Sequence, residues 1–171
     1  MKKTSLLPFL AGLALTASCA LPLTAAPAKT ADNVTVTFHE PEKFTDVLEN
    51  GSNLTSTYYL DQLRDCLLTA AAPLLARGEK LAITVTDIDL AGETRFNQPH
   101  QIRIMKDIYV PRIALNFQLL GADGKVLKEG ERKLVDLNYM MQLRRLGSDQ
   151  PLYYDKQLLT SWLQAEFKAK H

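Results

Sequence analysis

The chain has 171 residues, of which 46% are apolar and 23% are charged, a balance typical of one folded globular domain. This composition excludes a disordered tail, a collagen-like chain and a small scaffold held together by many disulfide bonds. The formal net charge of +1 provides no strong field, so neither nucleic acid nor an anionic membrane is an expected partner.

The beginning of the chain has the pattern of an export signal. Two lysines precede an uncharged apolar run, and the Ala-Pro-Ala sequence at 26–28 supplies the small residues that a signal peptidase requires. The run is short for a spanning helix and contains proline and glycine. We therefore predict a cleaved signal peptide at 1–28 and a single periplasmic or secreted domain at 29–171, with no transmembrane span after cleavage.

A lipid anchor is the alternative form of export. Thr16-Ala-Ser-Cys19 resembles a bacterial lipobox, but the first position of that motif is usually leucine and is threonine here. After cleavage at the predicted site, Cys66 would be the one remaining cysteine, which cannot form an internal disulfide. Hydrophobic packing alone must then hold the domain together.

The first part of the mature domain predicts a strand, a loop and a helix in that order. Residues 29–33 form a polar leader that we expect to fray. Apolar residues alternate with threonines over 34–38, which indicates a strand with one buried face. Residues 39–57 are rich in turn-forming residues, whereas 57–77 carry an apolar stripe at helical spacing. Pro73 lies inside this stripe, so the helix should kink or restart there.

The next segment predicts a second strand over 80–90, followed by a long connection. The apolar alternation advances by an odd step in this strand, which predicts a bulge near Thr86 and Asp87. The connection over 92–107 is polar and irregular in sequence. Long connections inside compact domains are often functional, so this segment is the first place to look for a site.

The last part of the chain predicts two more strands and a helix. Alternating patterns over 108–120 and 125–137 flank a glycine-containing turn, which is typical of a β-hairpin. An apolar stripe over 154–168 predicts the final helix. The order β-α-β-β-β-α predicts an α+β domain with a largely antiparallel four-stranded sheet and two helices on one face.

Acidic residues gather at the end of the second predicted strand. Asp87 and Asp89 are two residues apart, so their carboxylates should share one face of a strand, and Glu93 follows closely. Such oxygen ligands suit calcium or magnesium, but the spacing matches no calcium-binding loop. The simpler interpretation is that these side chains cap a turn at the end of a strand.

Basic residues follow directly in the long connection. Arg95, His100, Arg103 and Lys106 lie in this connection, and Arg112 lies near the start of the next predicted strand. Arginine is the side chain best suited to bind an anion or a carboxylate, although solvated surface charges would look the same in sequence. We therefore take as the candidate binding site Asp87, Asp89, Glu93, Arg95, Arg103 and Arg112.

No catalytic residue, metal ligand set or cofactor is predicted. His39 and His100 have no histidine or cysteine at ligand spacing, which argues against zinc. The chain has neither a Gly-x-Ser-x-Gly nucleophile motif nor a glycine-rich phosphate loop. Cys66 lies beside an apolar stripe, where a packed thiol is expected.

Several stretches together resemble a bacterial family of unknown function, the domain-of-unknown-function family numbered 3016. The matching residues are 36–38, 44–46, 86–93, 103–113, 124, 130, 134–136, 154–156, 159 and 162. The blocks 86–93 and 103–113 are the most specific, and Val110 departs from the proline expected there. The resemblance implies a small exported bacterial protein and implies no chemistry.

Three functions remain open at this point. The first is a periplasmic, non-enzymatic binding or accessory module that holds an anionic small molecule, a peptide or another envelope protein. The second is a metal-dependent or hydrolytic enzyme that uses Asp87, Asp89, Glu93 and His100. The third is a structural protein of the cell envelope that associates through an exposed face of its sheet.

Overall fold

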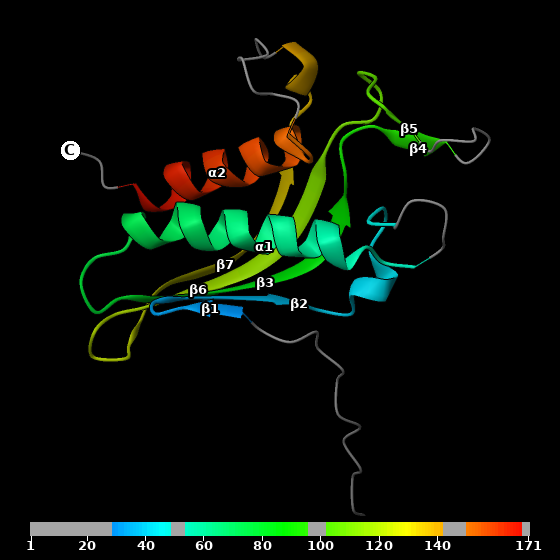
Figure 1. Cartoon of the computed structure of the whole chain (residues 1–171). Coiled ribbons are helices and arrows are strands. Elements are labelled where there is room, and N and C mark those ends of the chain that lie inside the picture. Colours follow the sequence, from blue (N-terminus) through cyan, green and yellow to red (C-terminus); the bar gives the residue numbers. More distant parts are fainter. Residues whose placement is uncertain (1–28, 49–53, 96–101, 142–149, 169–171) are drawn as a thin grey trace, which may run out of the picture.

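The computed structural model describes residues 29–48, 54–95, 102–141 and 150–168 (Figure 1). The predicted signal peptide at 1–28, including Cys19, lies outside the described residues, and so does His100. The elements in chain order are β1 (Lys29–Ala31), β2 (Val34–Phe38), the short 3-10 helix η1 (Pro41–Lys43), α1 (Thr57–Ala71), the 3-10 helix η2 (Ala72–Leu74), β3 (Lys80–Asp89), β4 (Glu93–Arg95), β5 (Ile102–Ile104), β6 (Arg112–Leu120), β7 (Val126–Val135), the 3-10 helix η3 (Tyr139–Met141) and α2 (Tyr153–Phe167).

The fold is α+β, as the sequence pattern predicts. One sheet has the strand order β1-β2-β3-β6-β7, and both α-helices lie on the same side of it (Figure 1). Strands β2 and β3 pair in parallel because α1 forms the crossover between them, while the other neighbours pair antiparallel. The four predicted strands are β2, β3, β6 and β7.

Two predicted irregularities are present in the structure. The register between β3 and β6 shifts between Val85 and Asp87, which is the predicted bulge. The shift returns Ile88 to the buried face after the alternation of Leu81, Ile83 and Val85. Helix α1 ends before Pro73, and the chain continues as η2, because proline cannot donate the next helical hydrogen bond.

Two segments contain strands that the sequence pattern misses. The polar leader forms β1, which pairs with β2 from Lys29 to Ala31. The long connection after β3 forms a two-stranded hairpin of β4 and β5, in which Thr94 pairs with Arg103. Each of these strands has three residues, which is too short for a period-two pattern to be recognised.

The core lies between the two α-helices and the sheet. Helix α1 contributes Leu63 and Leu67, and α2 contributes Leu159 and Leu163, all of them fully buried. They pack against the inward face of the sheet in one cluster. In the part of the chain that the structure describes, no helix is both long enough and apolar enough to cross a membrane.

Candidate functional site

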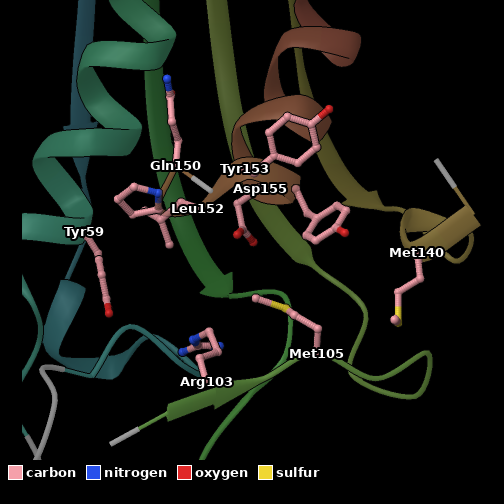
Figure 2. Close-up of a pocket in the computed structure, with 10 residues that line it drawn as sticks. Tyr59, Arg103, Met105, Met140, Gln150, Leu152, Tyr153 and Asp155 are labelled. Atoms are coloured by element: carbon pink, nitrogen blue, oxygen red, sulfur yellow. The ribbon is translucent and has the colours of Figure 1, made fainter. Parts of the chain in front are cut away.

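A cavity of about 340 Å³ opens where the first turn of α2 faces the β5 strand and the start of α1 (Figure 2). We call it the α2 pocket. Its walls include Tyr59, Arg103, Met105, Met140, Tyr154 and Asp155. These side chains come from α1, from β5 and the residue after it, from η3 and from α2, so packing of distant segments creates the pocket.

Asp155 is the central polar group of the α2 pocket. It lies in the first turn of α2, where the positive end of the helix dipole favours a carboxylate. Its side chain is 2% exposed, and Oδ1 accepts a hydrogen bond from the Ala91 backbone N–H at 2.9 Å. Burial raises the pKa of Asp155 to about 6, although the Ala91 N–H and the Arg103 guanidinium both act to lower it.

The start of α2 is held in a strained conformation beside this carboxylate. Leu152 precedes the helix with φ 60° and ψ 30°, a left-handed conformation that a non-glycine residue rarely adopts. The cost is about 1–2 kcal/mol, and Leu152 is retained there while packing against the core and lining the α2 pocket. Such strain gathers at functional sites, where surrounding packing imposes it.

Arg103 holds the turn that connects β3 to β4. Its Nη1 donates to the carbonyl oxygens of residues 90, 91 and 92 at 3.2, 3.1 and 2.9 Å, and its Nη2 donates to Asp46 Oδ2 at 2.9 Å. Asp155 holds the same turn through the Ala91 N–H. The two charged side chains therefore fix one backbone segment between them, and this fixes their own positions.

An aromatic cluster supports one side of the pocket. Tyr139 is fully buried, donates its hydroxyl to the Lys106 carbonyl at 2.6 Å, and meets the ring of Tyr154 edge to face with 4.8 Å between centroids. Tyr153 meets Tyr154 in the same way at 5.3 Å. These contacts restrict the rotamers of the rings around the cavity.

The structure brings one of the six predicted site residues into the α2 pocket, namely Arg103. Asp87 and Asp89 do share one side of β3, as predicted, but Ile88 between them points into the core, so both carboxylates lie on the face away from the helices. Asp87 accepts hydrogen bonds from the Thr45 backbone N–H at 2.8 Å and hydroxyl at 3.0 Å, which fixes a loop.

The remaining predicted residues lie apart from the α2 pocket or are described only in part. Arg112 Nη1 donates to Asp89 Oδ2 at 3.1 Å, and burial raises the pKa of Asp89. Glu93 is half-buried in β4 opposite Ile104, and the backbone of Arg95 pairs with Ile102. Among the described residues, no three His, Cys, Asp or Glu side chains gather closely enough to hold a metal ion.

Sequence reasoning missed Asp155, Tyr59 and the methionines of the pocket. An acidic residue in the first turn of a helix is ordinary, because the dipole favours it in any exposed helix. The available signal was weak: Asp155 lies among residues that carry the apolar stripe of the helix. Its burial depends on the turn after β3, which is distant in sequence.

Comparisons with known proteins place the chain in a family. Neither the curated proteins nor the solved structures gave a match. A family model described as "Protein of unknown function (DUF3016)" matches residues 32–165, which include α1, all of α2 but its last two residues, and every strand of the main sheet except β1. The match covers the greater part of the chain, and the chain therefore belongs to the family described as Protein of unknown function (DUF3016).

Proposed function

We propose that the protein is an exported, non-enzymatic binding module whose ligand site is the α2 pocket. The volume of about 340 Å³ lies in the range of small-molecule sites. The walls combine apolar and aromatic side chains with two charged groups, which is the usual composition of such a site. The pattern of residues 1–28 supports export.

The observation that carries this proposal is the buried carboxylate of Asp155. A carboxylate that is 2% exposed reduces stability at neutral pH, because its charged form loses hydration. The hydrogen bond from Ala91, the charge of Arg103 and the backbone N–H of Asp155 itself compensate for part of this loss. A buried acid with a shifted pKa that lines a cavity is a candidate functional group, because functional sites concentrate such groups.

The arrangement favours binding over catalysis. The charged groups of the pocket are held by backbone atoms: Asp155 by the Ala91 N–H, and Arg103 by three carbonyls. Rigid, preformed groups of this kind suit the recognition of a ligand. The enzyme alternative relied on Asp87 and Asp89, which are engaged by Thr45 and Arg112 instead.

Filling the α2 pocket tests the proposal. Met140 lines the pocket and is 45% exposed, whereas the adjacent Met141 is 84% exposed and does not line it. We expect compounds from a small-molecule library that raise the Tm of the wild-type protein to do the same for Met141→Trp, and to lose this effect on Met140→Trp. Both variants are first compared with wild type by circular dichroism.

The outcome that contradicts the proposal is equally specific. If stabilising compounds act equally on Met140→Trp and Met141→Trp, the ligand site lies elsewhere. If no compound stabilises the wild-type protein, the α2 pocket is a packing feature and the proposal fails.

A further inference from the structure

We propose that the α2 pocket binds an organic cation, a protonated amine carried on an apolar body, with the amine against the Asp155 carboxylate. This inference rests on the proposed function and adds the chemical class of the ligand. It departs from the anionic ligand that the run of arginines in the sequence suggests. The reason is the way in which the structure uses Arg103.

Both terminal nitrogens of the Arg103 guanidinium are engaged by protein acceptors, whereas its buried Nε has no hydrogen-bond partner among the described residues. Nη1 faces three carbonyl oxygens within 3.2 Å, and Nη2 forms an ion pair with Asp46 at 2.9 Å. The side chain of Arg103 is 14% exposed. An anion that pairs with Nη1, or that replaces Asp46 at Nη2, would have to displace these acceptors, and each displaced acceptor would lose a hydrogen bond to a charged donor. The Nε–H is buried, so an anion in the cavity gains no exposed donor there.

Asp155 is in the opposite situation. Its carboxylate accepts hydrogen bonds from the Ala91 backbone N–H and from its own backbone N–H, and among the described residues no lysine, arginine or histidine lies within ion-pair distance of it. Figure 2 shows its carboxylate pointing into the space that Tyr59, Arg103 and Met105 surround. The carboxylate therefore has acceptor capacity directed at the cavity, where a donor from a ligand can reach it.

The charges around the cavity favour a cation. Asp155 and Asp46 contribute two negative charges, and Arg103 contributes one positive charge. The start of α2 adds only about half a positive charge through the helix dipole. Counted over the described residues, the ionised site is therefore net negative, so an ammonium group brings it closer to neutrality and a carboxylate ligand makes the imbalance larger.

The walls suit the rest of such a ligand. Tyr59, Tyr153 and Tyr154 line the cavity, and aromatic faces attract ammonium groups. Met105 and Met140 add flexible apolar surface that can adapt to different hydrocarbon bodies. The same chemistry is offered by a free aryl or alkyl amine and by a lysine side chain of a polypeptide.

A matched series of compounds tests the inference at pH 7.5 by calorimetry and NMR titration of the full exported protein. Benzylamine, benzyl alcohol and benzoate have similar bodies and differ in charge. We expect benzylamine to bind wild type at least about tenfold more tightly than benzyl alcohol, and benzoate to bind most weakly. A short acetylated peptide with one lysine, measured alongside, distinguishes a polypeptide source from a small-molecule source.

Variants provide the control. Asp155→Asn keeps the size and the Oδ1 acceptor for the Ala91 N–H but removes the charge, so benzylamine should bind it no better than benzyl alcohol. Asp107→Asn, an exposed change outside the pocket lining, should bind like wild type. Binding of benzyl alcohol or benzoate as tight as that of benzylamine, or no binding of benzylamine, overturns the cation inference. Suppose that benzyl alcohol or benzoate binds as tightly as benzylamine. If Met140→Trp abolishes that binding, the α2 pocket is still the ligand site and only the cation inference fails. If Met140→Trp does not affect that binding, the cation inference and the proposed site both fail.

Discussion

At the scale of single residues, Asp155 couples the stability of the protein to pH. Its pKa is about 6 in the folded protein and 3.8 when unperturbed, so the folded state binds a proton more tightly than the unfolded state. The protonated carboxyl of Asp155 therefore contributes to the free energy of unfolding. This contribution is fully present below about pH 4 and is lost as the pH rises through about 6. The charged or titratable groups that face it are Arg103, Asp46 and Tyr139.

We expect Asp155→Asn to be more stable than wild type above about pH 6 by roughly 1–3 kcal/mol, and to differ little near pH 4. Urea denaturation across this pH range measures the difference. The unfolding free energy of Asp107→Asn should depend on pH in the same way as that of wild type. Burial also raises the pKa of Asp89, but Asp89 is present in all three proteins, so it affects their pH dependence equally. A constant difference between Asp155→Asn and wild type at every pH would contradict the assignment.

Gly92 is the second residue on which the site depends. Its φ of +82° is unfavourable for side chains, and a Cβ there would lie 2.8 Å from the Ile104 carbonyl oxygen and 2.7 Å from Met105 Sδ. Gly124 has a similar φ of +78°, but nothing lies within 4 Å of its added Cβ. Substituting alanine at Gly124 therefore adds backbone strain alone, whereas the same change at Gly92 adds both backbone strain and steric overlap.

Gly124→Ala should lose about 1–2 kcal/mol of unfolding free energy through strain alone. Gly92→Ala should lose at least about 1 kcal/mol more, because the backbone of Ile104 cannot move away without breaking the β4–β5 hairpin. Urea denaturation measures both losses of unfolding free energy. Equal losses in the two variants would show that the β4–β5 hairpin can shift to accommodate the added Cβ at little cost.

At the scale of elements, an ion cluster attaches the end of α2 to β7. Glu166 accepts hydrogen bonds from Arg132 Nε and Nη2, both at 2.9 Å, and forms an ion pair with Lys128 at 2.6 Å. The Trp162 ring nitrogen donates to the same carboxylate at 3.3 Å. The hydrogen bonds from Arg132 and the charge of Lys128 hold the pKa of Glu166 at about 2.

We expect Glu166→Gln to lower the unfolding free energy at pH 7 by about 1–3 kcal/mol. Because the folded pKa lies below 4.5, the wild-type contribution is present above pH 4.5 and is lost as the pH falls toward 2, so the variant should converge with wild type in acid. Glu129→Gln, which removes an exposed carboxylate on β7 that accepts one bond from Gln118, serves as the control and should change stability by less than about 0.5 kcal/mol. A Glu166→Gln deficit that persists at pH 2 would contradict the electrostatic explanation.

Sequence periodicity predicted the long elements well and the short ones not at all. Strands β2, β3, β6 and β7 and both α-helices carry enough repeats for a period to be read. Strands β1, β4 and β5 have three residues each, and their pairing depends on partners or turns that local pattern does not encode. The β4–β5 hairpin is stabilised by Arg103, whose acceptors lie at the end of β3.

At the scale of the whole molecule, the export prediction concerns residues that precede the described domain. We expect the exported product to begin at Lys29, because small residues occupy the predicted cleavage site. Intact-mass measurement of the periplasmic fraction checks this. Ala28→Asp should block cleavage, and Cys19→Ser should leave the mass unchanged. A product that carries a lipid, or that retains the first 28 residues, would contradict the prediction.

The amino-acid sequence by itself determined the order of the long elements, the face that each one buries, the bulge in β3 and the end of α1 before Pro73. These features follow from residue spacing along a helix or strand, which is a local property. Only the tertiary structure decided the site. Arg103 acquires its acceptors, and Asp155 its burial, when the turn after β3 packs against the first turn of α2. A local sequence pattern does not predict this contact between distant segments, because the free energy of a charged side chain depends on the groups that surround it in the folded protein.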